Sequence, residues 1–167
     1  MENWKTIKDY ETYEVSDFGR IRNKITKNML NPSVKKSGYS TVVLYGPKKH
    51  QVFFVHRLVA KAFIQNEKVQ VDHIDGNRQN NVLNNLRWAT PVENGGNKKI
   101  QKNKVHSRYK GVTKERNKYR AVITFNRKTI FLGHYETELQ ASQAYDLKAL
   151  ELLGQFAKTN HPITTYL

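Results

Sequence analysis

The chain has no cysteine among its 167 residues, and this absence excludes several kinds of protein. Disulfide-stapled scaffolds and zinc sites with thiolate ligands are excluded, so each domain must be held by its own packing in a reducing compartment. No apolar run approaches the ~20 residues of a membrane-spanning helix. The segment from Met1 to Asp9 is too polar for a signal peptide. We therefore expect a cytoplasmic protein that has no membrane partner.

Acidic residues are also scarce. The chain carries 14 Asp and Glu against 29 Lys and Arg, which gives a formal net charge of +15. Such an excess predicts a polyanionic partner, because each phosphate that a cation neutralises releases a condensed counterion. Nucleic acid is the first candidate. An anionic membrane surface is the weaker one, because the sequence has no lipidation signal.

The N-terminal part is typical of a β-rich lobe. Residues 1–66 alternate aromatic or β-branched residues with polar ones, which predicts short antiparallel strands. The run from Gly38 to Tyr45 is the clearest of them, and residues 17–19 are typical of a turn. From Val55 to Phe63 the apolar residues recur at i, i+3, i+4, i+7 and i+8, which predicts one face of a helix.

The C-terminal part is typical of three strands and one helix. The strand-like segments are Arg108–Thr113, Lys118–Phe125 and Lys128–Tyr135. Thr137 and Gln140 have the spacing of a capping box, and Gly154 suits the end of a helix. Alternation then predicts two faces for the middle strand: Tyr119, Ala121, Ile123 and Phe125 toward the helix, and Lys118, Arg120, Val122 and Thr124 away from it.

The stretch from Asp72 to Asn94 combines one imidazole, hard oxygen ligands and a run of Asn. Hydrolysis of a phosphodiester needs a base that deprotonates water and a cation that stabilises charge on the phosphate and the departing 3′ oxygen. His73 suits the first role, and the oxygens of Asp72 and Asn94 suit Mg²⁺ or Mn²⁺. Neighbours on a strand point to opposite sides, so the backbone must turn beside His73. Residues 75–77, Asp-Gly-Asn, can form that turn.

Residue chemistry alone leaves less specific interpretations open. A His next to an Asp is most often structural, and Asp-Gly-Asn is most often only a turn. An EF-hand calcium loop is excluded, because Leu83 stands where its bidentate Glu should be. His56 fits packing or hydrogen bonding at the start of the predicted helix better than it fits a ligand role.

Four motifs together resemble the HNH homing endonucleases of phages and their introns. They are residues 55–60 (Val-His-Arg-Leu-Val-Ala), 72–77 (Asp-His-Ile-Asp-Gly-Asn), 84–90 (Asn-Asn-Leu-Arg-Trp-Ala-Thr) and 93–94 (Glu-Asn). The resemblance implies a ββα-metal finger with strands near 69–73 and 86–90 and a helix from about 91. Its third motif residue is Asn here instead of His, a form that the phage branch also has.

The same resemblance implies roles for individual residues. His73 would be the general base, and Asn85 would support the loop and orient His73. Asp72 and Asn94 would bind the divalent ion. The implied reaction is DNA hydrolysis to 5′-phosphate and 3′-hydroxyl ends.

Both flanking parts resemble DNA-binding modules. Residues 4–23 resemble the small β-rich module that precedes the finger in these enzymes. A purely structural cap stays open as the alternative, although Arg20 and Arg22 favour phosphate contacts. Residues 107–112, 119–121, 131–135 and 144–146, together with Gly154, resemble the plant ethylene-response-factor (APETALA-type) domain, in which a sheet enters the DNA major groove and a helix backs it.

The expected DNA contacts lie along the C-terminal sheet and the segment before it. On the sheet they are Arg108, Lys110, Lys114, Arg116, Lys118, Arg120 and Thr124. Lys98, Lys99, Lys102 and Lys104 lie in or beside a Lys-rich linker at 99–106, which is either a solvated tether or a segment that follows the DNA backbone. The plant base code is not transferable, because Lys110, Thr113 and Glu115 replace several plant Arg residues.

Together these observations predict an α+β chain with four segments. They are a β-rich nuclease-associated module (1–54), an HNH ββα-metal core (55–98), the basic linker (99–106) and an APETALA-type domain (107–160) whose three-stranded antiparallel sheet packs on one helix. The predicted function is a metal-dependent, site-specific, homing-type endonuclease that acts on double-stranded DNA, in the cytoplasm of a bacterial host if phage-encoded. No required protein partner is evident.

Several alternatives stay open at this point. A single finger cuts one strand, so the sequence is compatible both with nicking and with double-strand cleavage by a dimer or by two successive nicks. A catalytically inactive DNA-binding regulator and a basic RNA-associated protein are the two other functional classes that fit the charge.

Overall fold

The computed structural model describes residues 1–46, 50–65, 67–97 and 107–166. They form two compact units, Met1–Thr90 and Pro91–Leu167. The predicted linker at 99–106 lies outside the described residues.

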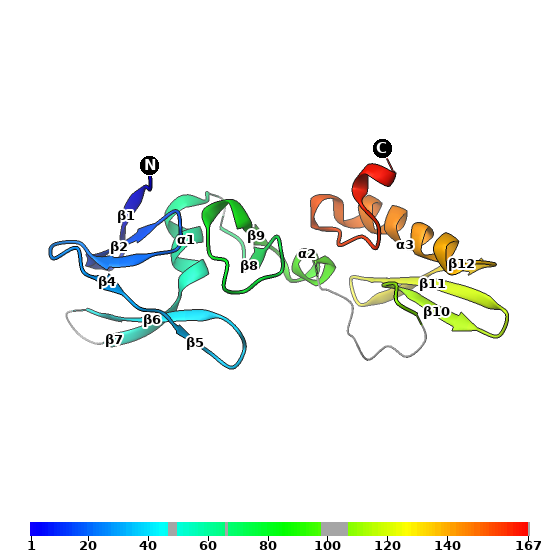
Figure 1. Ribbon diagram of the computed structural model, residues 1–167, viewed down its shortest axis with the longest axis horizontal. Coiled ribbons are helices and arrows are strands. Elements are labelled where there is room, and N and C mark those ends of the chain that lie inside the picture. Colours follow the sequence, from blue (N-terminus) through cyan, green and yellow to red (C-terminus); the bar gives the residue numbers. More distant parts are fainter. Residues whose placement is uncertain (47–49, 66, 98–106, 167) are drawn as a thin grey trace. The chain divides into compact units, whose positions relative to one another are not determined.

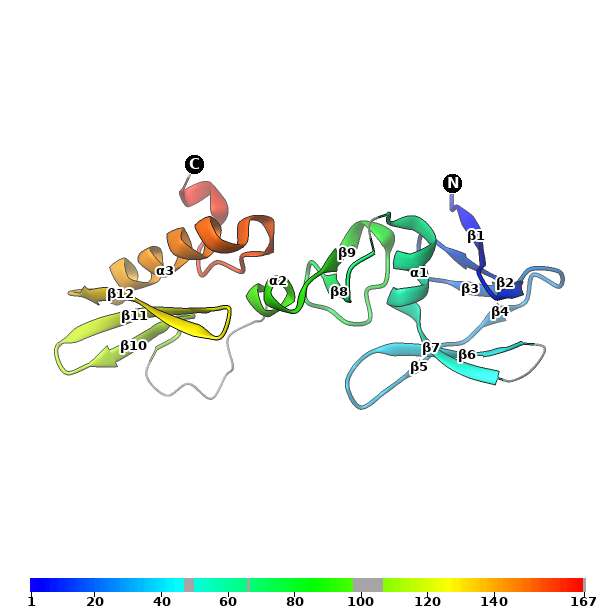
Figure 2. The same ribbon diagram turned by 180° about the vertical axis from the view of Figure 1, so that it is seen from behind.

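Two small antiparallel sheets make up most of the first unit. β1 (Trp4–Ile7), β2 (Tyr10–Ser16), β3 (Ile21–Asn23) and β4 (Met29–Leu30) lie side by side in that order (Figure 2). β5 (Ser33–Val34), β6 (Ser40–Tyr45) and β7 (His50–Phe54) form the second sheet. The predicted turn at 17–19 is confirmed. It requires Gly19, whose φ is +77° and whose Cβ, if it had one, would lie 2.8 Å from Cβ of Asn81.

α1 (Val55–Phe63) lies between the four-stranded sheet and the last two strands of the unit (Figure 1). It has the predicted bounds, and it buries Val55, Leu58 and Val59 at 6% exposure or less. These side chains share one hydrophobic core with residues of both sheets and with Trp88. The expected domain boundary between residues 54 and 55 therefore falls inside a single core, and the structure has no division there.

The strands expected near 69–73 and 86–90 are confirmed as β8 (Gln70–His73) and β9 (Leu86–Ala89). They pair antiparallel, with Asp72 opposite Arg87 and His73 opposite Leu86. A short 3₁₀ turn, η1 (Leu83–Asn85), precedes β9. The helix expected from 91 is α2 (Pro91–Gly96), which belongs to the second unit.

The second unit is a three-stranded antiparallel sheet with α3 (Glu138–Leu153) against one face (Figure 1). Its strands are β10 (Val112–Glu115), β11 (Lys118–Phe125) and β12 (Lys128–Tyr135), and the last two have the predicted bounds. Ala121 and Ile123 of β11 are buried under the helix, as the alternation predicted. The capping box is present: the Thr137 hydroxyl accepts from the Gln140 amide at 3.2 Å, and the Gln140 side chain accepts from the Thr137 amide at 3.2 Å.

β10 begins later than predicted. The expected strand at 108–113 starts only at Val112, because the chain turns at Gly111 with a φ of +77°. A Cβ at Gly111 would lie 2.0 Å from Cδ2 of Tyr145, so no larger residue could bring the backbone so close to α3. Residues 108–111 are therefore a bend and a turn instead of a strand.

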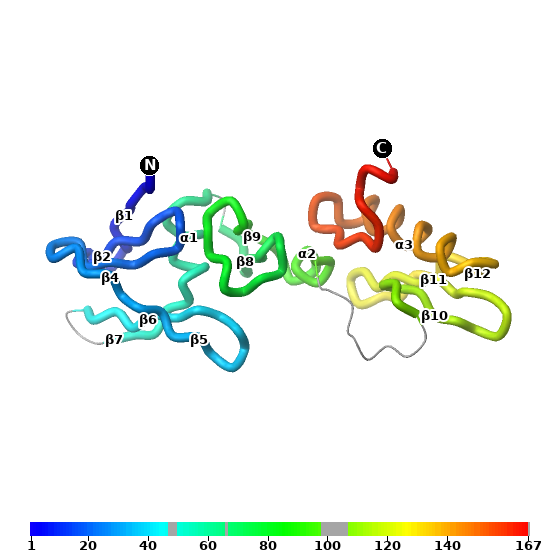
Figure 3. The backbone as a smooth tube through the Cα atoms, viewed as in Figure 1, coloured from blue at the N-terminus to red at the C-terminus, as the bar shows by residue number. Residues whose placement is uncertain are grey.

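The segment after α3 folds back along that helix (Figure 3). It contains two short 3₁₀ turns, η2 (Gly154–Phe156) and η3 (Ile163–Thr165). Asp146 of α3 is fully buried and accepts four hydrogen bonds from it: from Asn160 N at 2.7 Å and Nδ2 at 3.0 Å, from His161 N at 2.9 Å and from the Tyr166 hydroxyl at 2.9 Å. This carboxylate ties the C-terminal segment to the helix.

Candidate active site

Asp72 and His73 are the last two residues of β8, and both are buried, at 4% and 5% exposure. The turn that the sequence required follows at once, because Gly76 N donates to His73 O at 2.8 Å. The Asp72 carboxylate is paired with Arg87 on the neighbouring strand. Nε and Nη2 of Arg87 lie 2.9 Å and 2.7 Å from Oδ2 of Asp72. Both nitrogens donate to one carboxylate oxygen, and this charged pair fixes the carboxylate next to His73.

The imidazole of His73 is hydrogen-bonded to Asn81. Nε2 of His73 lies 3.1 Å from Oδ1 of Asn81, and Nδ2 of the same amide donates to Gln79 O at 3.1 Å. Because the amide nitrogen is engaged with a carbonyl, the oxygen must face His73, and an amide oxygen only accepts. Nε2 therefore carries the hydrogen in the neutral ring, and the lone pair is on Nδ1.

Burial lowers the pKa of His73 below the usual value for histidine, with the nearby Arg78 as a minor contributor. The hydrogen bond to Asn81 and the charges of Asp75 and Asp72 oppose this effect without reversing it. The imidazole of His73 is therefore neutral at physiological pH.

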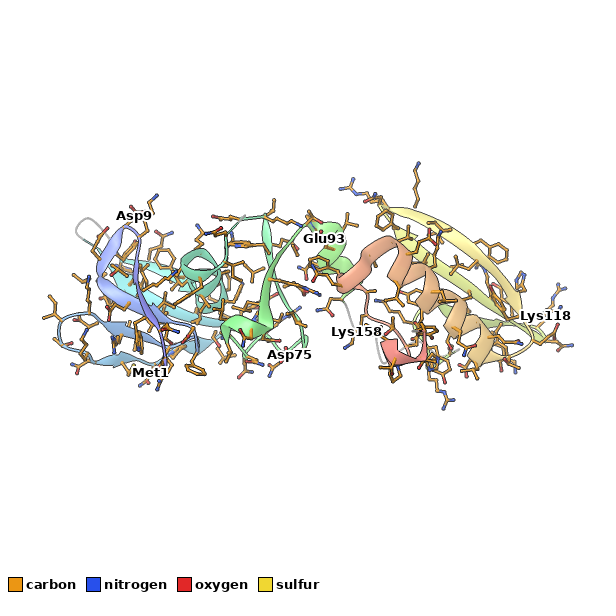
Figure 4. All side chains as sticks on the ribbon, turned by 90° about the horizontal axis from the view of Figure 1, so that it is seen from above. Met1, Asp9, Asp75, Glu93, Lys118 and Lys158 are labelled. Carbon is orange, nitrogen blue, oxygen red and sulfur yellow. The ribbon has the colours of Figure 1, made fainter. Side chains whose placement is uncertain are left out.

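Asn85 holds the loop that follows β8. Its Oδ1 accepts from Asp75 N at 3.0 Å, and its Nδ2 donates to Asp75 Oδ1 at 2.9 Å and to Asn80 O at 2.8 Å. Asp75, labelled in Figure 4, also accepts from Asn77 N at 2.7 Å and from Asn80 Nδ2 at 2.8 Å. Burial raises the pKa of Asp75, but these hydrogen bonds outweigh burial and the pKa is lowered overall.

The sequence analysis placed the loop-supporting role on Asn85, whose side chain is hydrogen-bonded to Asp75 and Asn80 of that loop. The side chain that contacts the imidazole is Asn81, which the sequence analysis did not single out. The only signal was the run of Asn itself, and that run does not say which member reaches His73.

Profiles of two known families match the chain. The one described as HNH endonuclease matches residues 53–95, and the NUMOD4 motif matches residues 2–45. An uncharacterised HNH endonuclease of Acanthamoeba polyphaga mimivirus, L560, is 42% identical over 127 residues, which cover 75% of this chain and 64% of that protein. Protein 3.8 of Escherichia phage T7 is 38% identical over 90 residues, which cover 53% of this chain and 73% of that protein.

A solved structure matches as well. It concerns DNA binding and cleavage by the HNH homing endonuclease I-HmuI, a protein of Bacillus phage SP01. The match has a TM-score of 0.50 and 41% identity, and it covers 53% of this chain and 52% of that one. The chain belongs to the HNH endonuclease family. It spans about half to two thirds of the length of L560 and I-HmuI.

HNH endonucleases generally use a divalent metal ion. The oxygens that this chain offers are hard donors, which fit such an ion: the Asp72 carboxylate on β8, and the amide of Asn94 in α2. Among the described residues no three His, Asp or Glu side chains gather into a metal-holding cluster.

The N-terminal arginines expected to contact DNA are both engaged with acidic residues. Arg20 pairs with Glu2. Arg22 pairs with Glu14 at 2.8 Å, and its guanidinium carbon lies 3.8 Å from the ring centroid of Trp4. The hydrogen bond from Arg22 lowers the pKa of Glu14. In this HNH protein Arg22 therefore has a structural role in the first sheet, whereas Arg20 keeps an exposed side chain.

The cations of the second unit fall into two groups. Most are exposed near the β10–β11 turn or on the outer face of the sheet, where Lys118, labelled in Figure 4, lies 2.8 Å from Glu136 and Arg120 lies 3.3 Å from Glu115. The exposed cations among the expected contacts are Arg108, Lys114, Arg116 and Lys118, and Thr124 of β11 is exposed as well. Lys98, Lys99, Lys102 and Lys104 lie outside the described residues.

Lys110 differs from the rest. Its Nζ donates to Gly96 O at 2.6 Å and lies 5.8 Å from the ring centroid of Tyr145. Burial lowers the pKa of Lys110 to about 8. Its ammonium is therefore engaged with a backbone carbonyl inside the second unit.

For the APETALA-type resemblance, comparison with known proteins gives only a weak partial match. An AP2-like ethylene-responsive transcription factor of Arabidopsis thaliana, At1g16060, is 40% identical over 65 residues, which cover 36% of this chain and 19% of that protein. No helix among the described residues is both long and apolar enough to cross a membrane.

Proposed function

We propose that this protein is a homing-type, site-specific DNA endonuclease that requires a divalent ion, Mg²⁺ or Mn²⁺. The observation that carries the proposal is the hydrogen-bond chain from Gln79 through Asn81 to His73, because it places the proton on Nε2 and the lone pair on Nδ1. A buried, neutral imidazole of fixed tautomer next to a paired carboxylate is what a general base for hydrolysis needs.

The base acts through Nδ1 of His73. It removes one proton from a water molecule as the water oxygen attacks phosphorus in line with the 3′ oxygen. The bond between phosphorus and the 3′ oxygen breaks, so the phosphate stays on the 5′ end and the 3′ oxygen becomes a hydroxyl with a proton from solvent. A divalent ion on Asp72 and Asn94 would stabilise the negative charge on the phosphate and on the departing oxygen.

Other residues hold this arrangement in place. Arg87 orients the carboxylate of Asp72 through two hydrogen-bonding nitrogens. Asn85 and Asp75 close the loop that carries Asn81. The role of Asn94 as the second metal ligand rests on the sequence motif.

The partner that we propose is double-stranded DNA. The net charge of +15 supports binding to a polyanion. On the second unit the exposed cations of β10, β11 and their turn would contact phosphates, with Thr124 on the outer face of β11 near base edges. The alternation of β11 supports this placement, because Ala121 and Ile123 pack against residues of α3.

The test is cleavage of a plasmid library with a randomised insert in Mg²⁺, followed by recovery of the cut ends. We expect nicked or linear plasmid whose ends DNA ligase rejoins, because the ligase requires a 5′-phosphate and a 3′-hydroxyl. His73→Ala, purified in parallel, should lack this activity. Cleavage by His73→Ala at the parental rate would refute the assignment and indicate a contaminating nuclease.

A further inference from the structure

Two rings, those of His56 and Tyr39, contact the imidazole of His73, and the ring of Phe54 packs against both of them. The ring centroid of His56 lies 5.1 Å from that of His73 at an interplanar angle of 65°, and Tyr39 lies 6.0 Å from it. The rings also contact one another: Tyr39 lies 5.0 Å from His56 and 5.6 Å from Phe54, and Phe54 lies 5.5 Å from His56. We refer to Tyr39, Phe54 and His56 as the ring wall.

The ring wall is built from separate parts of the first unit. Phe54 ends β7, and His56 is in the first turn of α1. Tyr39 immediately precedes β6 and lies within residues 2–45, which match the NUMOD4 motif and not the nuclease profile. The N-terminal module thus contributes a side chain that contacts the base.

His56 contacts His73 through the packing of the two rings. Its Nδ1 is the only buried side-chain nitrogen or oxygen that lacks a hydrogen-bond partner in the described part of the chain. Burial lowers the pKa of His56 to about 3, so the ring stays uncharged wherever His73 can act as a base. A neutral ring packed edge to face confines its neighbour without adding charge to the site.

Tyr39 is held from its other side by Arg78. The guanidinium carbon of Arg78 lies 4.8 Å from the ring centroid of Tyr39, and Nη1 donates to Ser37 O at 2.7 Å. Arg78 belongs to the loop after β8, so the loop and the β5–β6 turn are fixed to each other. Arg78 therefore supports the Tyr39 side of the ring wall, and α1 and β7 carry the other two rings.

The hydrogen bond between Nε2 and Asn81 holds one atom of the His73 imidazole. A rotation of the ring would move Nδ1 relative to the phosphate. Contact with rings on one side removes this rotation, because interiors are close-packed and side chains keep one rotamer.

We propose that the ring wall positions the imidazole of His73, with His56 and Tyr39 as positioning residues, and that the N-terminal module is thereby part of the nuclease centre. This inference rests on the proposed function, since it assumes that His73 is the base. It assigns the module a second task besides any contact with DNA.

The experiment compares single-turnover nicking rates and DNA affinities of the full chain and four variants. His56→Ala removes a ring, and His56→Phe restores one. Tyr39→Leu removes the ring from the N-terminal module. Val59→Ala is the matched control, because Val59 is a fully buried residue of α1 outside the ring wall. The parent and His73→Ala are assayed first, so that failure of the proposed function is recognised separately.

We expect His56→Ala and Tyr39→Leu to lower the rate constant about 10- to 100-fold at nearly unchanged DNA affinity, because a misplaced base slows chemistry and not binding. His56→Phe should recover most of the rate, and Val59→Ala should keep it. An undiminished rate in His56→Ala would overturn the proposal. So would an equal loss in Val59→Ala, which would indicate a general stability effect, or an equal loss in His56→Phe, which would assign the role to a nitrogen. If His56→Ala does not fold, the nicking rates of Tyr39→Leu and His56→Phe test the proposal. A parental rate in Tyr39→Leu, or a strongly lowered rate in His56→Phe, would then overturn it.

Discussion

Replacing His56 by Phe should make the first unit less sensitive to acid. Burial, followed by the charges of His73 and Arg57, lowers the pKa of His56 to about 3. The same side chain in the unfolded chain titrates near ~6.5. Below that pH the His56 side chain is protonated in the unfolded chain but stays unprotonated in the folded chain. The stability that depends on neutral His56 is therefore present above pH ~6.5 and is lost as the pH falls.

The expected loss follows from the two pKa values. Each pH unit below ~6.5 costs about 1.4 kcal/mol, so lowering the pH from ~7.5 to ~5.0 lowers the free energy of unfolding by about 2 kcal/mol through His56 alone. His56→Phe removes this contribution. It also removes a buried nitrogen without a partner, which should add about 1 kcal/mol at pH ~7.5.

Urea unfolding followed by tryptophan fluorescence measures the free energy of unfolding of the first unit at each pH. Both tryptophans of the chain, Trp4 and Trp88, lie in the first unit, so the signal reports that unit and not the second. Val59→Ala serves as the control, because it changes packing and no titratable group, and its difference from the parent should be the same at both pH values. If the free energy of unfolding falls by the same amount in His56→Phe and in the parent between pH ~7.5 and ~5.0, then burial of neutral His56 does not cause the acid sensitivity.

Three further outcomes are expected. Asn81→Ala should lower the nicking rate about 10- to 100-fold, because Nε2 of His73 loses its hydrogen-bond partner. Asn84→Ala is the control, because Asn84 is an exposed member of the same Asn run, and its nicking rate should be unchanged. Equal nicking rates in the two variants would contradict the tautomer assignment. Chelation by EDTA should abolish nicking and leave a gel shift on duplex DNA intact, and nicking that persists in EDTA would exclude a metal-dependent mechanism. Asp146→Ala should destabilise the second unit by about 3–5 kcal/mol, because four hydrogen bonds to a buried carboxylate are lost, and limited proteolysis should then cut the C-terminal segment while tryptophan fluorescence is unchanged.

Local pattern was sufficient for much of the fold. The bounds of β11, β12 and α1 follow from periodicity, and the start of α3 follows from the capping box of Thr137 and Gln140. These features depend on residues that are close in sequence. The start of β10 does not, because it depends on how closely Gly111 approaches Tyr145 on a distant helix. A strand-like composition at 108–113 could not predict that contact.

In the candidate site, too, some features follow from local sequence and others depend on the folded structure. Asp72 and His73 can be selected from their chemistry, since few side chains can serve as a base or a hard ligand. The partner of the imidazole cannot be selected in this way, because five Asn residues follow His73 before β9 and only the folded loop selects Asn81. Nor does a count of positive charges predict that Arg22 lies over Trp4 and pairs with Glu14, a neighbour across the β2–β3 pair.

The single core of the first unit has a practical consequence for building chimeras. A junction near residue 54, at the end of the β-rich module, would leave Val55 and Leu58 without the side chains of β2 and β6 that cover them. A junction at Thr90 keeps every member of that core in one piece. A chimera between relatives should therefore keep residues 1–90 as one block, so that His73 and the N-terminal module stay together, and it should retain Asn at position 94 beyond the junction.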